Sequence, residues 1–498
     1  MPHLIERTMD DTRRHASRLL DPSRRSQLGQ FMTPTGIADF MTSLFTHWPD
    51  HARLLDPGAG IGSLTEAFAA RFALQACAGA SFDAHCYEIE PLLLGYLADH
   101  LSEIETRLKS QRHPCSSQIH ERDFIAEASF AATMGGTRFT HAILNPPYKK
   151  ISAGSLHRKL LRSANIETVN LYAAFLALTI ALMETGGEIV AIVPRSFCNG
   201  PYYRPFREFL LERAAIRQMH IFESRTHAFK DDEVLQENII IHLVRGEKQA
   251  ALRVSTSNDG SFADYKARLV PFSEIVKPGD AERFIHIPTE PENDVGNLFT
   301  ATLDDLGIEV STGPVVDFRL KEHWLPMPQP PCVPLLYAHH FKGGEFVWPK
   351  EHKKPNALKL NDDTRKWLMP RGCYTVIKRF SAKEERRRLV AFVVDPECLP
   401  AKQYGFENHL NVFHSHKQGI APDLAHGLAL FLNSTVADRH FRTFSGHTQV
   451  NATDLRAMRY PCHAELIRLG RWAREQKELT QTKIDAMLGF TEGHLSTE

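Results

Sequence analysis

The run Asn145-Pro146-Pro147-Tyr148 combines groups that could hold a planar ring carrying an exocyclic amine. The Asn side-chain oxygen and the Pro146 carbonyl could accept both N–H hydrogens of such an amine, which would localise the lone pair on its nitrogen. The two prolines restrict φ and remove backbone donors, so this carbonyl is rigidly aimed. Tyr148 offers a flat face for stacking. Taken alone, the run is also typical of an ordinary rigid turn.

A second candidate is the glycine loop Asp56-Pro57-Gly58-Ala59-Gly60-Ile61-Gly62. Glycines on alternate positions let a backbone turn tightly and approach a ligand closely. The spacing differs from the G-x-G-x-x-G of dinucleotide sites, and no Lys-Ser/Thr follows as in a phosphate loop. Because S-adenosylmethionine has no pyrophosphate, this departure favours it as the cofactor; a purely structural turn is the alternative. The residues assigned to cofactor binding here are Asp56, Gly58, Gly60 and Gly62.

Acidic residues end two further predicted strands. Glu88 ends the second, where a carboxylate can accept ribose hydroxyls in charge-assisted hydrogen bonds. Glu90 is the alternative, because the gap after Asp56 exceeds the roughly 20 residues of a tight nucleotide-binding unit. Asp123 and Phe124 end the third strand and offer an acceptor for an adenine amine and a ring to flank its face. Singly, these residues are typical of surface acids and core aromatics, but their order at successive strand ends favours a shared pocket.

Strand-like and helical segments alternate through the first half of the chain. The expected strands are 52–56, 81–90, 117–124, 140–145, 187–194, 217–222 and 238–244, and helical segments include 63–72, 169–184 and 205–213. This alternation predicts an α/β fold: a seven-stranded, mostly parallel, Rossmann-like sheet of the kind found in S-adenosylmethionine methyltransferases, with helices on both faces. Ligands of such sheets bind outside the carboxyl ends of the strands, where both candidate sites fall.

The pattern changes after Arg245, and 498 residues exceed what one core supports. We therefore expect a catalytic domain at 1–250, a linker at 251–300 and a second domain at 301–498. The last is rich in Pro, Gly, His and aromatic residues with short strand-like pieces, which predicts a mixed α+β domain. A charged helical segment at about 464–487 closes it.

Basic residues are concentrated in the second domain, although the whole chain has 59 basic and 59 acidic residues. Between positions 342 and 388, fourteen Lys or Arg stand against six Asp or Glu. A solvated face balanced by Glu384 and Glu385 is one interpretation, and contact with DNA phosphates is the other. The loop at 445–451 could read bases, bind phosphates or simply order itself. The candidate DNA-binding residues are Lys378, Arg379, Lys383, Arg386, Arg387, Arg388, Gln449 and Asn451.

Several classes of protein are disfavoured by composition. The eight cysteines are scattered without a C-x-x-C pair, so we expect free thiols that are mostly buried, and no metal site. No apolar run approaches the roughly 20 residues that span a bilayer, and the N-terminus is too charged for a signal peptide. We therefore expect a cytoplasmic protein without a membrane partner.

Together, the strand ends change the interpretation of the turn at 145–148. Beside a pocket for S-adenosylmethionine, it fits methyl transfer to the N6 amine of adenine, a poor nucleophile whose lone pair is delocalised into the ring. Transfer would be an in-line displacement that depends on positioning and electrostatics. A target adenine in a duplex would have to be flipped out to reach this pocket.

The chain resembles the N6-adenine DNA methyltransferases of bacterial type II restriction–modification systems in their gamma arrangement, with cofactor motifs first, the catalytic motif next and target recognition last. The motifs carrying the resemblance are Gln30-Phe31-Met32-Thr33-Pro34, the glycine loop, Glu88, Asp123-Phe124 and Asn145–Tyr148; it extends to VIKRFSAKEERRRL, ENHLNVFH and FSGHTQVNATDLRAMRYP. It implies that Thr33 helps to hold the methionine part of the cofactor. It further implies that an aromatic residue, Phe229 or alternatively Phe222, stacks on the flipped adenine.

The resemblance also implies partners. Residues 301–498 would form the target recognition domain on double-stranded DNA, and a separate cognate restriction endonuclease would belong to the same system. We expect the chain to act as a monomer. Alternative functions are methylation of an RNA guanine or a protein glutamine by the same tetrad, or a non-catalytic DNA-binding subunit. The first two need only the first domain, and the last is disfavoured by the intact Asn145 and Tyr148. Methylation of the N4 amine of cytosine more often uses Ser in place of Asn145.

Overall fold

The computed structural model divides the chain into two compact units, residues 1–289 and 290–498. It describes all residues except 1, 21–31, 137, 223–236, 290–298, 343–344, 382–384, 447 and 490–498. Within this described part, no helix is both long and apolar enough to cross a membrane.

The first unit is built on one mixed sheet of nine strands in the order β3-β2-β1-β4-β5-β7-β6-β8-β9. The strands are β1 (His51–Pro57), β2 (Ser81–Tyr87), β3 (Cys115–His120), β4 (Phe139–Leu144), β5 (Met183–Pro194), β6 (Ala214–Phe222), β7 (Asn238–Arg245), β8 (Leu252–Ser257) and β9 (Lys266–Val270). Strands β1 to β5 run parallel to one another, and β7 is antiparallel to both β5 and β6. The α/β class was predicted, but the expected number of seven strands was wrong.

The two additional strands lie in the segment that the sequence led us to treat as a linker. Strand β8 pairs parallel to β6, and β9 pairs antiparallel to β8 at the edge of the sheet. Their sequences, LRVSTS and KARLV, are rich in polar residues. Ser255 and Ser257 of β8 satisfy the ring nitrogens of buried His220, and Leu269 of β9 is exposed. Strand β9 forms the edge of the sheet, where no continuous apolar run is needed, and β8 beside it is buried but carries polar side chains, so hydrophobic pattern revealed neither strand.

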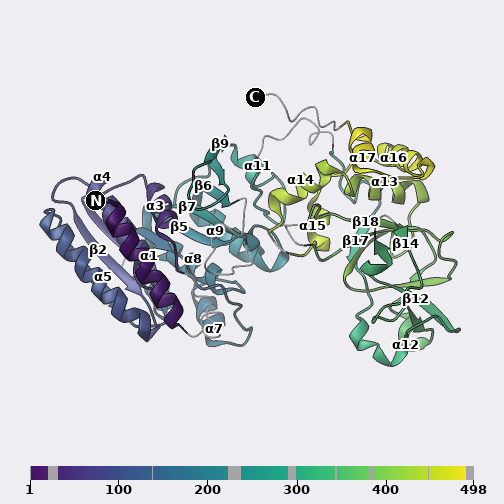
Figure 1. Ribbon diagram of the computed structural model, residues 1–498, viewed down its shortest axis with the longest axis horizontal. Helices are drawn as coiled ribbons and strands as arrows, with labels where there is room; N and C mark the ends of the chain where they lie inside the picture. Colours follow the sequence, from purple (N-terminus) through teal and green to yellow (C-terminus); the bar gives the residue numbers. More distant parts are fainter. Residues whose placement is uncertain are drawn as a thin grey trace. The chain divides into compact units, whose positions relative to one another are not determined.

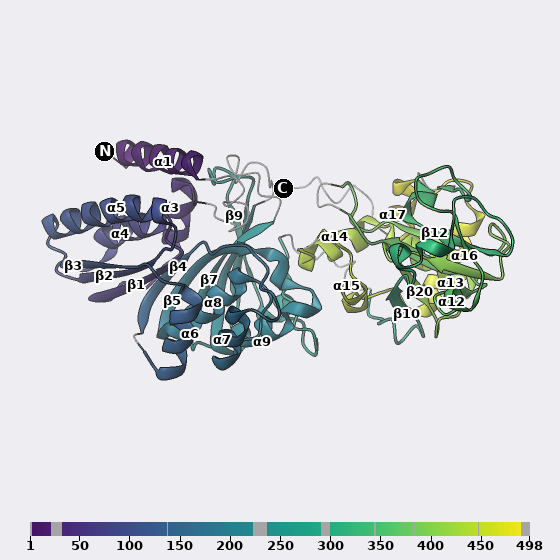
Figure 2. The same ribbon diagram turned by 90° about the horizontal axis from the view of Figure 1, so that it is seen from below.

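Helices cover both faces of this sheet, as Figure 2 shows. Buried residues of α3, α4 and α5 pack on one face, and those of α6, α7, α8 and α9 pack on the other. The helices are α1 (Pro2–Leu19), α3 (Thr35–Ser43), α4 (Ser63–Gln75), α5 (Pro91–Ser110), α6 (Phe124–Met134), α7 (Leu156–Ser163), α8 (Leu171–Leu182), α9 (Arg204–Arg213) and α11 (Phe272–Ile275). Strand β4, buried along its whole length, lies between these layers.

Local sequence explains where the helices next to the strand ends begin. Pro91 occupies the first turn of α5, where its missing N–H costs nothing. The Asp123 carboxylate caps α6 by accepting the Ala126 N–H at 2.9 Å, and the Ser155 hydroxyl caps α7 in the same way. Helices α5 and α6 therefore start four residues beyond the ends of β2 and β3, and α7 starts twelve residues beyond the end of β4.

The second unit contains a four-stranded sheet, β10-β20-β17-β18, a five-stranded sheet, β11-β15-β12-β19-β16, and the hairpin β13-β14. Its strands are β10 (Glu309–Thr312), β11 (Trp324–Leu325), β12 (Cys332–Leu336), β13 (Phe341–Lys342), β14 (Glu345–Phe346), β15 (Ala357–Lys359), β16 (Met369–Pro370), β17 (Tyr374–Lys378), β18 (Ala391–Val394), β19 (Gln403–Phe406) and β20 (Leu410–His414). All pairs are antiparallel except β12 with β19.

Helices complete the second unit, labelled in Figure 1. They are α12 (Asp362–Arg365), α13 (Pro422–Leu432), α14 (Thr435–Phe444), α15 (Ala452–Ala457), α16 (His463–Glu475) and α17 (Gln481–Met487). Helices α13 and α16 touch through their glycines: a Cβ on Gly427 would lie 1.8 Å from the Leu466 carbonyl oxygen. The C-terminal segment expected as one helix is thus two, α16 and α17.

Candidate active site

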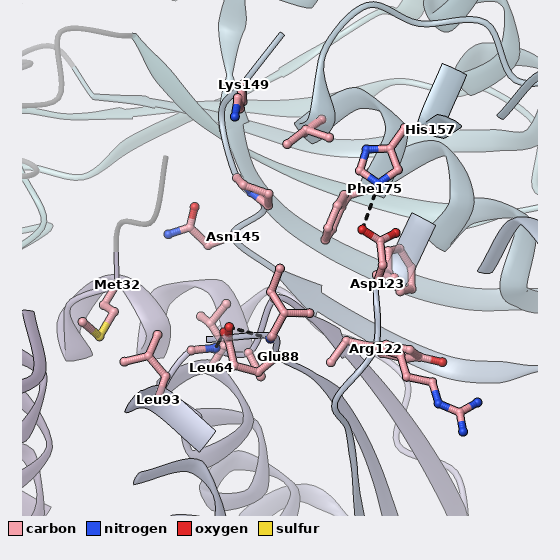
Figure 3. A pocket seen from close by; sticks show the side chains of 18 of the residues that line it. Met32, Leu64, Glu88, Leu93, Arg122, Asp123, Asn145, Lys149, His157 and Phe175 are labelled. Carbon is pink, nitrogen blue, oxygen red and sulfur yellow. Dashed lines mark hydrogen bonds and ion pairs between the residues drawn. The ribbon is translucent and has the colours of Figure 1, made fainter. Parts of the chain in front are cut away.

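A pocket of about 360 Å³ lies at the carboxyl ends of β1, β2, β3 and β4. This volume is within the range of small-molecule sites. Figure 3 shows Asn145, Glu88 and Asp123 around the same space. The pocket is lined by Met32, Thr33, Gly58, Ala59, Gly60, Ile61, Ser63, Leu64, Tyr87, Glu88, Ile89, Leu93, Arg122, Asp123, Phe124, Asn145, Pro147, Lys149, Lys150, Ile151, Ser152, Ser155, His157, Leu171 and Phe175.

The glycine loop follows β1 and forms one wall of the pocket. Gly58, Gly60 and Gly62 have φ of 85°, 60° and 88°, a region that strongly favours glycine. Gly58 and Gly60 line the pocket, whereas Gly62 precedes α4. Asp56 lies beneath the loop, fully buried, and accepts the Thr65 hydroxyl at 2.7 Å. Burial raises the pKa of Asp56 to about 7, and the Glu88 carboxylate adds to the rise, while the Thr65 hydrogen bond opposes it.

Glu88 connects the loop to the end of β2. One carboxylate oxygen accepts the Gly60 N–H at 2.9 Å, and the other accepts the N–H groups of Ile89 and Glu90, both at 2.8 Å. Burial raises the pKa of Glu88 despite these three donors. Glu88 lines the pocket and Glu90 does not, so the geometry favours Glu88 over Glu90 for contact with a ligand.

Asp123 and Phe124 were expected to end the third strand, but they lie just beyond β3, as the N-cap and the first residue of α6. Asp123 also has a partner that sequence reasoning missed. Its second oxygen lies 2.9 Å from Nε2 of His157 on α7. Although burial disfavours the charge of Asp123, this contact and the Ala126 N–H lower its pKa. The same contact raises the pKa of His157. Phe124 packs against Phe175 of α8, with ring centroids 4.9 Å apart.

The Asn145 side chain is held in one orientation by two neighbours. Its Nδ2 donates to the Thr33 hydroxyl oxygen at 3.1 Å, and its Oδ1 accepts the Tyr148 hydroxyl at 2.9 Å. The Tyr148 hydroxyl also lies 3.3 Å from the Ile192 carbonyl oxygen, and burial raises its pKa, so it stays a neutral donor. Pro146, which stands between Asn145 and Tyr148 in the sequence, is buried. Thr33 and Asn145 thus meet although 112 positions separate them.

The two aromatic residues predicted to stack on a base, Phe229 and Phe222, differ in what the structure says of them. Phe229 lies outside the described residues, and its role stays a prediction. Phe222 ends β6, is 3% exposed, and packs among Phe40, His220 and Phe262 on the α3 face of the sheet. It does not line the pocket, so the geometry does not favour it.

Two of the predicted DNA-binding arginines are held inside the second unit. Arg388 is 1% exposed; it donates to Ser381 and Ser445, and its guanidinium lies 5.5 Å from the Phe441 ring centroid. A phosphate role for Arg388 is therefore wrong for this structure. Arg387 is partly buried and donates to the Asn433 carbonyl, and burial lowers its pKa. The charge run alone could not distinguish inward from outward residues.

The other candidates remain near the surface around the end of β17. Arg386 is exposed, and Lys378 forms a 3.0 Å ion pair with Glu385. Arg379 donates to Gln449 at 3.3 Å, which joins the two predicted segments. Asn451 caps α15 and bonds Asp454, so its side chain orders the loop. Lys383 lies outside the described residues.

Sequence reasoning missed several residues that line the pocket, among them Met32, Lys149, His157 and Phe175. Lys149 follows the predicted turn directly, so its position was a usable signal. His157 and Phe175 come from α7 and α8 and carry no motif that distinguishes them from ordinary helical residues.

Comparison with known proteins places this pocket in a family. The model of the Eco57I restriction-modification methylase family matches residues 78–229, which include the ends of β2, β3 and β4. The chain is 49% identical to the type II methyltransferase M.BsuBI of Bacillus subtilis over 500 residues, covering 98% of each chain. It is 41% identical to M.PstI of Providencia stuartii over 497 residues, covering 98% of this chain and 97% of that one.

The chain belongs to the type II methyltransferases. Solved structures extend the likeness of fold over both units of this methyltransferase. The alignment with the DrdV–DNA complex covers 95% of this chain and 60% of the DrdV chain, with a TM-score of 0.55 and 12% identity. The restriction-modification enzyme MmeI covers 96% and 78%, with a TM-score of 0.51 and 11% identity. The glycine loop and the Asn145 turn thus belong to a restriction–modification methyltransferase.

Proposed function

We propose that this methyltransferase transfers a methyl group from S-adenosylmethionine to the N6 amine of a flipped-out adenine in double-stranded DNA, with gamma motif order. The observation that carries the proposal is the chain of hydrogen bonds Thr33–Asn145–Tyr148 at the end of β4, bordering the glycine-loop pocket. Such methylation would protect host DNA from a separate cognate endonuclease.

The orientation of Asn145 fits an acceptor for an amine. Thr33 accepts an Nδ2 hydrogen, which fixes the orientation of the side-chain amide and identifies Oδ1 as its acceptor end. Oδ1 has two lone pairs, so it can accept a substrate N–H as well as the Tyr148 hydroxyl. With the Pro146 carbonyl as the second acceptor, both hydrogens of an N6 amine would be held and its lone pair would be free to attack. The acceptors are in place before the substrate arrives, which lowers the cost of reorganisation.

The residues around the pocket fit S-adenosylmethionine. Of the roughly four acceptor positions of a carboxylate, Glu88 uses three for backbone donors and keeps one, on the oxygen that accepts the Gly60 N–H, for a ribose hydroxyl. Phe124 would flank the adenine ring, and Asp123 would accept its amine in the place now shared with His157. When bound, the cofactor supplies an electrophilic methyl group on a sulfonium centre. Asp56 would act through the loop rather than by direct contact, since it lies beneath it.

For the second unit we propose the role of target recognition domain. Arg386, Lys378 and Arg379 are the candidates for phosphate contacts, and Gln449 for contact with a base or phosphate. Arg388 and Asn451 instead hold the unit's own structure. We further propose that the methyltransferase acts as a monomer.

The test is transfer of tritium from methyl-labelled S-adenosylmethionine to duplex DNA, followed by nucleoside analysis. We expect label in N6-methyladenine, and methylation-sensitive sequencing of DNA from expressing cells would identify the flanking bases. The Asn145→Ala variant, incubated in parallel, is the control for a contaminating enzyme. Label recovered as N4-methylcytosine, or in RNA or protein, would contradict the proposal.

A further inference from the structure

Three potential metal ligands lie close together in the second unit, which also carries the proposed DNA-contacting residues near the end of β17. The Cys373 Sγ, a carboxylate oxygen of Asp395 and a ring nitrogen of His426 all lie within 4.8 Å of one another. Cys373 directly precedes β17, Asp395 directly follows β18, and His426 is in α13. Donors of three different kinds therefore converge from three elements.

The backbone holds these elements in place. Strands β17 and β18 are antiparallel with Tyr374 opposite Val394, so Cys373 and Asp395 are the next pair beyond the ladder. On its other side, the Cys373 carbonyl accepts the Ile420 N–H at 2.9 Å. Two glycines permit this approach, since a Cβ on Gly372 would lie 2.7 Å from the Cα of Gly419. Helix α13 starts two residues after Ile420, which brings His426 over the strand ends.

In the described part of the chain, no hydrogen bond joins these three side chains to one another, and the Asp395 carboxylate accepts the Glu397 N–H at 2.8 Å instead. Nε2 of His426 is buried and has no hydrogen-bond partner among the described residues. Its distance to the nearer Asp395 oxygen, 3.8 Å, is too long for a hydrogen bond. Cys373 is 3% exposed, and the side chains of Asp395 and His426 are 19% and 25% exposed. A buried polar atom without a partner calls for an explanation, and a missing ion is one.

We propose that Cys373, Asp395 and His426 bind one Zn²⁺ as a structural ion of the second unit. Thiolate, imidazole and carboxylate are the three ligand types of protein zinc sites. Binding would release the thiol proton of Cys373 to solvent and give Nε2 of His426 its partner. Water would fill the fourth tetrahedral position, since the described ligand atoms within 4.8 Å of one another come from these three residues alone.

A bound ion would link the four-stranded sheet, through Cys373 and Asp395, to α13, through His426. Strand β17, which begins at the site, ends at Lys378 and continues into Arg379. An ion at its start would hold this strand against β18 and α13 and thereby stabilise the surface proposed to contact DNA. The proposed role of the ion is therefore to hold the second unit together, the unit to which all three ligands belong.

The test uses the full chain, expressed in zinc-supplemented medium and exchanged into metal-free buffer. We expect one zinc per chain by mass spectrometry. Replacement by Co²⁺ should produce a thiolate-to-cobalt charge-transfer band in the near ultraviolet. Cys373→Ser should lose the band, and His426→Gln should weaken it and lower zinc content. Cys77→Ser removes an exposed thiol of the first unit and should leave zinc and the band unchanged.

A measurement on the unaltered chain covers the case in which a variant does not fold. A strong chelator should lower the Tm of the wild type by several degrees, because removing an ion bound only by the folded state removes its stabilisation. Substoichiometric zinc in folded wild type, or a charge-transfer band that persists in Cys373→Ser, would overturn the proposal. These readouts do not involve methyl transfer, so their failure is separate from failure of the proposed function.

Discussion

The pocket of the first unit, proposed to bind the cofactor, and the basic segment of the second unit were both predicted from short runs of sequence. The two predictions differ in how far the residues of each run lie together in the structure. Residues at the ends of β1 to β4 line one pocket, because parallel strands bring their carboxyl ends to one edge. The basic run at 378–388 separates instead into exposed Arg386, partly buried Arg387 and buried Arg388. A parallel sheet converts order along the chain into proximity, whereas an irregular antiparallel unit assigns each residue its own environment.

The largest expected effect is on the pocket side. Asn145→Ala removes the oxygen proposed to accept the substrate amine, and we expect kcat to fall by about 10²–10³-fold, as for loss of one preorganised transition-state contact. Cofactor affinity, measured by calorimetry, should change little because Glu88 and the glycine loop remain. Asn258→Ala, at an exposed loop position, is the matched control and should retain full activity. An active Asn145→Ala enzyme would remove this residue from the chemistry.

The next effect separates the two arginines of the basic run. Arg388→Ala should destabilise the second unit by about 3 kcal/mol, because it leaves a cavity and unpaired buried hydroxyls. Arg386→Ala, one step outward, should stay within about 0.5 kcal/mol of wild type. Denaturant unfolding measures both. Equal stability of the two variants would contradict the different environments that the structure assigns to them.

A pH-dependent effect is expected from Asp56. Its pKa is raised to about 7 in the folded protein, so the stability that the protonated form provides is fully present below its unfolded pKa and is lost as pH rises toward 7. The ligand-free wild type should therefore lose about 2–3 kcal/mol relative to Asp56→Asn between pH 5 and pH 8. The comparison with Asp56→Asn isolates this group from histidines that titrate in the same range. Parallel pH profiles would show that Asp56 is ionised throughout.

A smaller effect should follow from the residue that orients Asn145. Thr33→Val removes the acceptor for the Nδ2 hydrogen, and we expect kcat to fall roughly tenfold, the equivalent of about 1.4 kcal/mol. Thr33→Ser, which keeps the oxygen, should restore most of the rate. Steady-state kinetics with both variants distinguishes orientation from cofactor binding, because a change confined to the cofactor KM would assign Thr33 to the pocket alone.

The smallest effect concerns exposed charge. Arg386→Ala should reduce the slope of log K for DNA binding against log salt by about 1, with a modest loss of affinity. The matched control is Lys483→Ala, at an exposed position of α17 where the side chain bonds the Glu478 carbonyl. An unchanged slope for Arg386→Ala would exclude it from the phosphate contacts.

Much of the pocket could be predicted because each signal was local. A strand followed by a glycine loop, a strand followed by Glu88 and a strand followed by the Asn145 turn each place a group at a strand end without knowledge of distant contacts. The α/β class followed from the same alternation. The strand count did not, since β9 at the edge and its buried neighbour β8 both carry polar residues in place of a continuous apolar run.

Residues that act through distant partners could not be predicted. His157 reaches Asp123 from α7, and Phe175 reaches Phe124 from α8, and neither lies in a recognisable motif. The Cys373, Asp395 and His426 cluster has no C-x-x-C spacing, so counting cysteines suggested no metal site. Antiparallel register and the contact at Gly372 and Gly419 create this cluster.

The sequence by itself determined the types and order of the groups around the pocket, because each is set by a residue and the strand that precedes it. Only the tertiary structure decided which side chains bond these groups. Thr33 orients Asn145 from 112 positions away in the sequence, and His157 bonds the Asp123 carboxylate. It also decided which arginines face solvent, since side-chain burial depends on packing from segments far away in the chain. Sequence pattern therefore predicts local geometry, whereas the side chains that contact a given residue are known only from the folded chain.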